Sequence, residues 1–427
     1  MENFGSGLAG LGFQNQIPTA FDFGDTSLCR EILHFAQKSH DYHAEKKLMD
    51  LLIALGVVII ASLVIMYACN SFDDAASYLG RNMAPGVRGA TINAIGSSMP
   101  ELMTAMFLLF LFHDRDGFAA GVATTAGSAI FNAVIIPALC IFAVRYKGVL
   151  VKGSGDAVAA VRERITRIEM SKSGLLRDGA FLLIAEAALI WFLGNSTMTW
   201  WMGGALLVIY GVYFLFLTSG FGATSDEDDD DDAEEEDDER PSKFKAILTF
   251  DFNNLIYNGK NYTTGSAWVV LSLATMAIGI ACWQLAEAVM SSADALDVPA
   301  YFTALIFAAA ATSVPDTVLS VKDAMRGEYD DAISNAVGSN TFDITVGLGF
   351  PLLVYALIFG DVAVMSADQT QALRIVLFAV TVVVLGVLLL RKHVTVATAY
   401  FLLIIYMGWM GFVFYDMASV VDAQGVG

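Results

Sequence analysis

Two short stretches that lie far apart in the chain carry the same order of hydroxyl groups, proline and carboxylate. The first, Ala94 to Glu101, reads AIGSSMPE, and the second, Ala309 to Asp316, reads AAATSVPD. In both, a pair of hydroxyl side chains precedes a proline that is followed directly by an acidic residue. This match within one chain indicates an internal duplication.

Each of these stretches is followed by a second matching segment. The segment GSAIFN begins at Gly127 and ends at Asn132, and the segment GSNTFD begins at Gly338 and ends at Asp343. Together the four segments supply carboxylates, an amide and hydroxyl groups at repeated positions. The candidate ligand side chains are Ser97, Ser98, Glu101, Ser128, Asn132, Thr312, Ser313, Asp316, Ser339 and Asp343.

The oxygen atoms in these segments are suited to hard cations. Ca²⁺ takes roughly six to eight oxygen ligands from carboxylates, carbonyls and water, and we expect Na⁺ to accept the same ligand types. Pro100 and Pro315 lack an N–H, so they are expected to kink their helices and to free the carbonyls of Gly96 and Ala311. No soft sulfur or imidazole ligand is expected close to the segments, which argues against zinc or copper.

Each candidate also has a purely structural interpretation. A hydroxyl in a membrane helix commonly bonds to a backbone carbonyl or a neighbouring helix, and Asn132 could bridge two helices. Glu101 and Asp316 are different, because a carboxylate at mid-membrane costs at least ~2.5 kcal/mol and such groups are usually functional. Asp343 could pair with a basic group, but its own span contains no Lys or Arg. We expect these four residues to contact ions, whereas Glu186 has no partner in the repeat, so ion access and structural pairing both stay open for it.

The elements that must hold these segments are apolar helices. The chain has 427 residues, is 56% hydrophobic and has a mean hydropathy of +0.59, so a soluble class is nearly excluded. A helix needs about 20 apolar residues to span a bilayer. Ten apolar stretches are predicted to span the membrane, over residues 48–72, 86–113, 117–144, 178–194, 198–219, 264–291, 299–323, 331–359, 371–390 and 395–415.

An acidic run divides the ten predicted spans into five and five. Residues 226–239 carry 13 acidic side chains in 14 positions, so the formal charge of −20 leaves about −7 for the rest of the chain. The run repels itself and is expected to be a solvated linker, with calcium sensing or partner docking as the alternative. The predicted organisation is an N-terminal extension (1–47), a first five-helix repeat (48–219), an acidic linker (220–263), a second five-helix repeat (264–416) and a C-terminal tail (417–427).

Basic residues predict the orientation of the spans. The connection after the third span holds eight Lys and Arg residues between Arg145 and Arg177, and such residues collect on the cytoplasmic side. This orientation puts both termini outside and the acidic linker in the cytoplasm, although four basic residues before the first span favour the reverse. We expect a multi-pass protein of the cell membrane.

A repeat of five spans, an odd number, must insert in opposite directions in its two copies. The copies are then related by a two-fold axis in the membrane plane, and matching segments meet near the midplane. The predicted fold class is therefore all-α integral membrane, with about ten transmembrane helices in two inverted five-helix repeats.

The cysteines and the N-terminal segment point to no further activity. Cys29, Cys69, Cys140 and Cys282 have no disulfide or metal-type spacing, and three of them lie in apolar stretches. The first 47 residues lack the compact apolar core of a cleaved signal and are expected to form an extension, helical around residues 28–47. No enzymatic activity, cofactor or nucleic-acid partner is expected, and the expected partners are ions and the lipid bilayer.

The motif segments resemble those of the sodium/calcium exchanger membrane region, a family of the cation/calcium exchanger superfamily. The resemblance rests on GATINAIGSSMPELMTA with GSAIFN and on ATSVPDTVLSV with AVGSNTFDITVG, and it extends over most of residues 48–415. It implies a ten-helix fold of two inverted repeats that exchanges Na⁺ for Ca²⁺ by alternating access at one central site. The first and sixth spans, which are expected to hold no buried charge, would slide over the motif helices.

The resemblance also implies a role for each candidate residue. Glu101 and Asp316 would be the principal Ca²⁺ ligands and would also bind Na⁺, with oxygen from Ser97 and Thr312 beside them. Asn132 and Asp343 would complete the cluster, and the positions lining Na⁺ would be Ala94, Ser98, Ser128, Ala309, Ser313 and Ser339. Two departures from the family pattern are mild steric changes, because Ala311 stands where glycine is usual and Ser97 stands where threonine is common.

The coupling ion stays open at this point. The segment SNTFDITVG, with its acid at Asp343, resembles potassium-dependent members, yet other members carry an acid there without potassium transport. A Ca²⁺/H⁺ exchanger could use the same carboxylates to carry protons, although the many hydroxyls and Asn132 favour Na⁺. A cation channel is a less favoured alternative, because inverted repeats with broken helices are typical of carriers.

Overall fold

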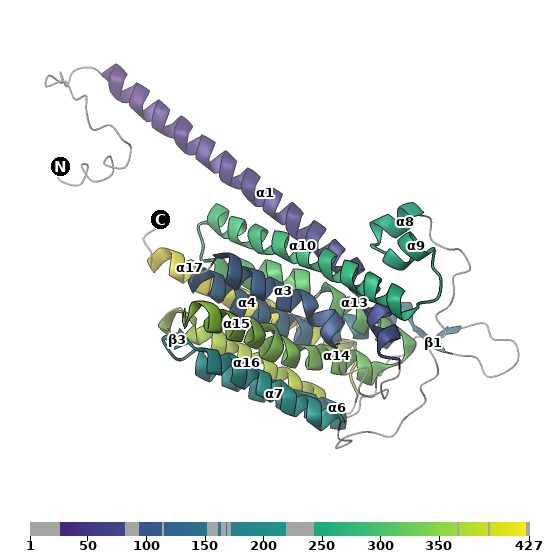
Figure 1. The fold of residues 1–427 in the computed structure, drawn as a ribbon. Helices are drawn as coiled ribbons and strands as arrows, with labels where there is room; N and C mark the ends of the chain where they lie inside the picture. Colours follow the sequence, from purple (N-terminus) through teal and green to yellow (C-terminus); the bar gives the residue numbers. More distant parts are fainter. Residues whose placement is uncertain are drawn as a thin grey trace, which may run out of the picture. The chain divides into compact units, whose positions relative to one another are not determined.

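The computed structural model describes most of the chain as helices (Figure 1). The chain divides into two compact units, Met1–Asp50 and Leu51–Gly427, and all of the candidate ligands belong to the second unit. The described residues are 26–81, 94–112, 115–151, 161–163, 168, 172–218, 243–364, 367–391 and 393–423. The acidic run 226–239 and the first 25 residues lie outside them, so the predictions made for these segments stay predictions.

Sixteen α-helices and three π-helical segments make up nearly all of the described residues. The α-helices are α1 (Thr26–Leu79), α3 (Ala94–Phe112), α4 (Arg115–Ile130), α5 (Ile136–Lys147), α6 (Lys172–Phe192), α7 (Trp200–Thr218), α8 (Lys243–Leu248), α9 (Phe252–Tyr257), α10 (Thr264–Leu296), α11 (Ala300–Thr303), α12 (Ala309–Thr312), α13 (Val314–Arg326), α14 (Tyr329–Phe342), α15 (Gly349–Phe359), α16 (Ala367–Leu390) and α17 (Val396–Ala423). The π-helical segments are η2 (Phe131–Ile135), η3 (Ala304–Ala308) and η4 (Asp343–Leu348).

Seven helices in the described part of the chain are long and apolar enough to cross a membrane. They are α1, α3, the run from α4 through η2 to α5, α7, α10, the run from α14 through η4 to α15, and α17. An eighth span results if the run from α11 to α13, which is bent by 41°, crosses as one unit. The two remaining predicted spans coincide with α6 and α16, so each prediction falls on a helix while the count of ten crossings stays a prediction.

Short strands connect some of these helices. β1 (Val149–Val151) pairs antiparallel with β2 (Val161–Glu163), in the basic connection that follows α5. β3 (Thr197–Met198) pairs with β4 (Val362–Ala363) and ties the loop after α6 to the end of α15. These ribbons join helix ends and carry none of the candidate ligands.

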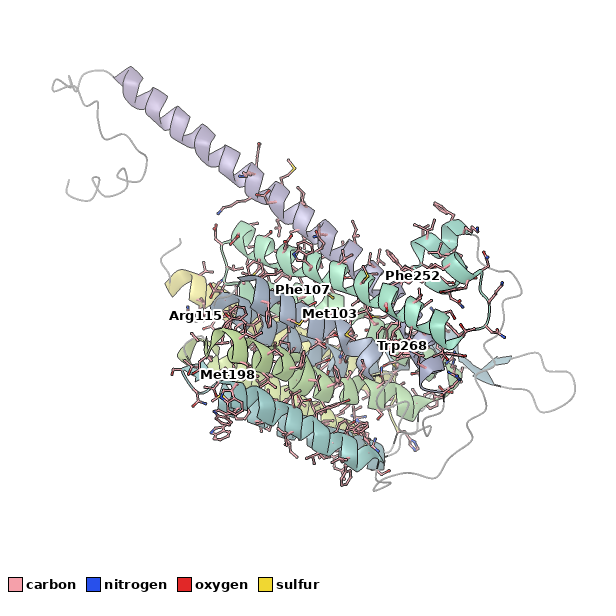
Figure 2. The ribbon with its side chains drawn as sticks, viewed as in Figure 1. Met103, Phe107, Arg115, Met198, Phe252 and Trp268 are labelled. Carbon is pink, nitrogen blue, oxygen red and sulfur yellow. The ribbon has the colours of Figure 1, made fainter. Side chains whose placement is uncertain are left out.

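The outer surface of the bundle is apolar, as expected of helices that face lipid. Trp268 on α10 is 57% exposed and points away from the bundle (Figure 2). Inside, small residues allow close contact between helices. A Cβ on Gly203 of α7 would come 2.7 Å from the carbonyl oxygen of Gly349 in α15, so only glycine permits this approach.

Two helix hairpins carry the motif segments. α3 packs on α4, and α13 packs on α14, while α4 contacts η3 and α3 contacts η4. The second segment of each pair coincides with a switch from α-helix to π-helix: Asn132 lies in η2, and Asp343 opens η4. Single-turn π-helical segments occur frequently at functional sites. The packing thus brings all four motif segments to one place.

The two prolines act differently in the two hairpins. α3 continues through Pro100 as one helix, whereas the second motif breaks at Ser313, and α13 restarts with Pro315 in its first turn. Proline is tolerated there because the first turn of a helix has no partner for its N–H groups. The predicted kink is therefore observed as a break before Pro315.

Candidate cation-binding site

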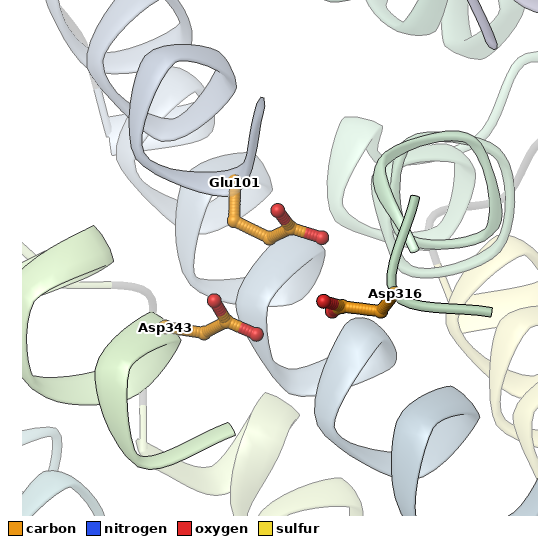
Figure 3. A group of neighbouring side chains, drawn as sticks. All are labelled: Glu101, Asp316 and Asp343. Carbon is orange, nitrogen blue, oxygen red and sulfur yellow. The ribbon is translucent and has the colours of Figure 1, made fainter. Parts of the chain in front are cut away.

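Three carboxylates meet inside the helix bundle. Glu101 comes from α3, Asp316 from the first turn of α13 and Asp343 from the first turn of η4, and all three are fully buried. One oxygen from each lies within 4.8 Å of those from the other two. Figure 3 shows the three side chains pointing toward a common centre. Glu101 and Asp316, which are 215 positions apart in the sequence, are thus brought within reach of one ion.

Ser128 on α4 lies among these carboxylates. Its Oγ lies 3.3 Å from Oε1 of Glu101, 3.5 Å from Oδ2 of Asp343 and 2.8 Å from Oγ of Ser313. A hydroxyl has one proton and cannot donate to three acceptors at once. The Ser128 oxygen therefore lies close to carboxylates from both halves of the chain.

Asn132 provides the amide of the site. Its Nδ2 donates to Oδ2 of Asp316 at 2.9 Å and lies 3.3 Å from Oγ of Ser339 and 3.4 Å from Oγ of Ser128. These contacts orient the amide nitrogen toward Asp316 and Ser339. The carbonyl oxygen Oδ1 is then left as a buried acceptor.

Hydroxyls from each half of the chain lie beside carboxylates of the site. Ser97 of the first motif lies beside Asp316 of the second, and Thr312 of the second lies beside Glu101 of the first. Ser98 lies beside Asp343. Each of the two motifs therefore places a hydroxyl group beside the carboxylate of the other, as expected if duplicated segments face one another.

Two alanines were predicted to line Na⁺ positions. Ala309 is buried, and a Cβ on Gly127 would come 2.6 Å from its Cβ, so α4 and α12 are in close contact here. Ala94 begins α3, seven residues before Glu101. Neither position has been tested as an ion ligand, and both stay predictions.

Four carboxylate and amide oxygens of the site are buried without a hydrogen-bond partner among the described residues. They are Oε2 of Glu101, Oδ1 of Asn132, Oδ1 of Asp316 and Oδ1 of Asp343. Buried acceptors without a donor are costly and rare, and buried carboxylates are expected to be paired or to bind a metal. Four oxygens of this kind, belonging to side chains linked by one network, fit a cation that takes oxygen ligands.

A thiol lies closer to the motifs than the sequence predicted. Cys282 of α10 donates from Sγ to the carbonyl oxygen of Pro100, at 3.6 Å. The expectation that no sulfur lies close to the motif segments is therefore wrong. It failed because α10 contributes no motif, and only its packing against α3 brings Cys282 there. The thiol faces a backbone carbonyl and is not among the three clustered carboxylates.

The other buried carboxylates lie away from the site. Oε1 of Glu186 on α6 accepts from Thr381 of α16 at 2.8 Å, which links two outer helices. Asp178, which the sequence did not single out, accepts from Arg177 at 2.7 Å and from Tyr213 at 3.1 Å, and also from Ser334. A carboxylate at the start of a predicted span, directly after an arginine, was the available signal for this cluster.

The structure also changes the description of the first span. The apolar stretch 48–72 was expected to hold no buried charge, but α1 continues to Leu79 and includes Asp73, whose Oδ1 is buried. Asp73 lies one residue beyond the predicted stretch, because the apolar run ends where the acidic pair Asp73 and Asp74 begins. The helix does not end there.

A comparison with protein-family models supports the resemblance of the motif segments. The model described as sodium/calcium exchanger protein matches residues 53–219 and 266–415. Each matched range contains one of the two hairpins of the site, and the acidic run 226–239 lies outside both ranges.

Two curated relatives illustrate the similarity of the sequence. Human sodium/potassium/calcium exchanger 5 is 25% identical over 358 residues, which covers 67% of this chain and 66% of that protein. The Drosophila melanogaster sodium/potassium/calcium exchanger Nckx30C is 34% identical over 118 residues, covering 27% of this chain and 13% of that protein. The chain therefore spans less than two thirds of the length of each relative.

Solved structures share the fold. An H⁺/Ca²⁺ exchanger, CAX, superposes with a TM-score of 0.58 at 14% sequence identity, covering 89% of this chain and 86% of its own. The sodium-calcium exchanger NCX_Mj, soaked with 10 mM Na⁺ and 10 mM Sr²⁺, gives a TM-score of 0.50 at 17% identity, covering 84% and 98%. At these identities the likeness establishes a shared fold and nothing about the ions.

Proposed function

The chain belongs to the sodium/calcium exchanger protein family, and we propose that it exchanges Na⁺ for Ca²⁺ across a membrane by alternating access. The observation that carries this proposal is the set of four partnerless buried oxygens on Glu101, Asn132, Asp316 and Asp343. Three of them belong to carboxylates clustered within 4.8 Å. Such a set supplies both the negative charge and the ligand atoms that a divalent cation needs.

Electrostatics gives a reason for exchange rather than leak. Two unit charges 4.8 Å apart repel by about 3 kcal/mol at an effective dielectric constant of 20. Three ionised carboxylates without a cation therefore carry several kcal/mol of repulsion inside the membrane. To switch sides, the protein must pass through a state in which water is excluded from the site, and this step is favoured only when ions are bound. Each movement of the site across the membrane therefore needs bound ions, which makes the transport an exchange.

The proposed ligand assignment follows the contacts. Glu101 and Asp316 bind Ca²⁺ between them, with Ser97 and Thr312 beside the opposite carboxylate. Na⁺ ions use the same carboxylates in turn. Their positions are lined by Ala94, Ser98, Ser128, Ala309, Ser313 and Ser339, and Asn132 and Asp343 complete the cluster.

The proposed switch moves α1 and α10 over the motif helices. The packing of α10 on α3 supports this assignment, because Cys282 contacts the carbonyl of Pro100 and Gly279 lies against Met103. A Cβ on Gly279 would still be 3.5 Å from Sδ of Met103, so the contact there is ordinary and permits sliding. In this proposal the protein has ten crossings in two inverted repeats.

Potassium coupling is a second candidate, and one observation favours it. Asp343 lies in the same carboxylate cluster as Glu101 and Asp316 and adds a third negative charge to the two that balance Ca²⁺. A site of formal charge −3 leaves one charge for a monovalent cation beside Ca²⁺. The relatives named above are sodium/potassium/calcium exchangers, which agrees with this candidate.

One experiment separates these functions. Proteoliposomes loaded with Na⁺ take up ⁴⁵Ca²⁺ from outside, with K⁺ present or absent, for the native chain, for Glu101→Gln and for the exposed control Asp116→Asn. We expect Na⁺-driven uptake in the native chain and the control, and none in Glu101→Gln. Uptake that requires K⁺ establishes potassium coupling, whereas uptake driven by a pH gradient without Na⁺ replaces the proposal with Ca²⁺/H⁺ exchange.

The cellular arrangement is part of the proposal. We place the protein in the cell membrane with the acidic linker in the cytoplasm and acting as a solvated connection between the repeats. Deletion of residues 224–240 is expected to leave the Ca²⁺ dependence of uptake unchanged. A changed Ca²⁺ dependence would instead make the linker a calcium-sensing segment.

A further inference from the structure

Asp73 on α1 is a carboxylate that the proposed transport site does not include. The side chain is half-buried, and its Oδ1 is buried without a hydrogen-bond partner in the described part of the chain. It lies against Gly96 of α3. A Cβ added to Gly96 would overlap Oδ1 of Asp73 and come 3.0 Å from its Cγ, so the absence of a side chain at Gly96 is what admits the carboxylate.

Gly96 belongs to the first motif. It stands four residues before Pro100, which lacks the N–H that would bond to the Gly96 carbonyl, and directly before Ser97, which lies beside Asp316. The five residues from Gly96 to Glu101 correspond to a rise of about 7.5 Å along the helix. Gly96, against which Asp73 lies, is therefore about one and a half helical turns from Glu101, nearer to the start of α3. We take this to be the side of the membrane on which α1 ends and α3 begins.

The charges near Asp73 connect this position with both the site and the solvent. Asp73 interacts electrostatically with Asp74, Asp316 and Lys322. Asp74 and Lys322 are exposed, whereas Asp316 is fully buried. Lys322 and Asp316 lie on the same helix, α13, six residues apart. Asp73 is thus within electrostatic range of both exposed charges and the buried cluster.

The second motif offers no equivalent. At the position that matches Gly96 it has Ala311, which is buried and whose methyl group leaves no room for a carboxylate to approach in this way. The feature is therefore confined to one half of a duplicated arrangement. A residue that only stabilised the hairpin would not need an ionisable side chain with a buried oxygen left unpaired.

We propose that Asp73, together with the backbone oxygen of Gly96, forms a staging position for cations at one mouth of the transport site. The inference rests on the proposed function and adds to it a residue of α1 that receives the ion before Asp316 and Glu101. Because α3 begins at this mouth and Ala311 replaces Gly96 in the other half, the staging position serves one side of the membrane only.

The test is a sided kinetic measurement. Purified protein is reconstituted in one orientation, and the KM for Ca²⁺ is measured from each face for the native chain, Asp73→Asn and the exposed neighbouring control Asp74→Asn. From the face where α1 ends, Asp73→Asn is expected to raise the KM for Ca²⁺ about sixfold and that for Na⁺ about 2.5-fold. These factors are those of one unit charge acting on a divalent or monovalent ion ~7.5 Å away in water.

The remaining outcomes decide against the inference or against its premise. The KM from the opposite face and the maximal rate are expected to change by less than about twofold, and Asp73→Glu is expected to restore most of the affinity. An unchanged KM on both faces, or an equal rise on both, overturns the staging position. If the native chain itself shows no Na⁺-driven Ca²⁺ flux, the proposed function fails instead.

A second variant covers the case in which Asp73→Asn does not fold. Gly96→Ala keeps the carboxylate but adds the methyl group that would displace it. It is expected to reproduce the one-sided rise in KM, and a variant that transports like the native chain from both faces overturns the proposal.

Discussion

Replacing Asp343 by asparagine tests whether the three carboxylates act on ions through their charge. The oxygen of Asp343 lies within 4.8 Å of those of Glu101 and Asp316, so an ion held by those two lies about 5 Å or less from it. At an effective dielectric constant of 20, one unit charge at about 5 Å contributes about 3 kcal/mol to a monovalent ion and about 7 kcal/mol to a divalent ion. Asp343→Asn should therefore weaken Ca²⁺ binding far more than Na⁺ binding.

The expected magnitude is a change in ion preference. The difference of about 3 kcal/mol corresponds to a change of roughly 100-fold in the ratio of Ca²⁺ to Na⁺ affinity. Movement of the ion and of water will reduce this value, and we expect at least about tenfold. Asparagine keeps the shape of the side chain and one carbonyl oxygen, so the comparison isolates the charge.

Stability provides a second readout with the opposite sign. Removing one of three clustered charges relieves repulsion in the protein without cations, so its unfolding temperature should rise. Stabilisation by added Ca²⁺ should shrink, because the stabilisation of the folded state by a ligand grows with the logarithm of the ratio of its concentration to the Kd. The thermal unfolding curves with and without Ca²⁺ are therefore expected to lie closer together for the variant than for the native chain.

The assay is equilibrium binding of ⁴⁵Ca²⁺ and ²²Na⁺ to purified protein, combined with thermal unfolding in each ion. Asp116→Asn is the matched control, since Asp116 is exposed at the start of α4, twelve residues or about 18 Å before Ser128. Equal loss of Ca²⁺ and Na⁺ affinity in Asp343→Asn would refute the electrostatic reasoning and indicate a change of shape. Unchanged affinity for both ions would remove Asp343 from the site.

Three further substitutions test the surroundings of the site. Asn132→Leu removes the amide donor that lies 2.9 Å from Asp316 and also removes a partnerless oxygen. Because a hydrogen bond to a charged group contributes about 1.5–3 kcal/mol, Na⁺-driven Ca²⁺ uptake should fall at least about tenfold in protein that still folds. Gly127→Val places a side chain where even a Cβ would come within 2.6 Å of α12. The substitution should lower the free energy of unfolding by about 1–3 kcal/mol, measured by thermal or denaturant unfolding. A variant as stable as the native chain would contradict this packing. Glu186→Gln keeps the acceptor for Thr381 and should leave uptake within about twofold of the native rate, and a loss of uptake would instead give Glu186 a part in ion access.

The composition of the site could be predicted because the duplication is visible in the letters. Asp316 and Glu101 follow prolines in matching segments, and Asn132 and Asp343 end the second pair of segments. A pattern that occurs twice in an odd-numbered helical repeat predicts that the copies face one another. The structure places Glu101, Asp316, Asp343 and Asn132 in one network, which confirms that these side chains gather.

The helix positions were predictable for a related reason. Each of the ten apolar stretches falls on a helix, because in a membrane protein the length and polarity of a stretch depend on the bilayer and not on the partners of the helix. The internal switch to π-helix at Asn132 and Asp343 had no such signal. It depends on how the side chains of neighbouring helices pack.

The sequence by itself determined that this protein has membrane helices, that its motifs are duplicated and which oxygens could bind a cation. Only the tertiary structure decided that Ser128 contacts Glu101, Ser313 and Asp343, that Cys282 donates to the carbonyl of Pro100 and that Asp73 lies against Gly96. The physical reason is that composition and spacing act along one helix. Contacts of α1 and α10 with the motif helices depend on small residues such as Gly96, whose missing side chain matters only once another helix lies against it.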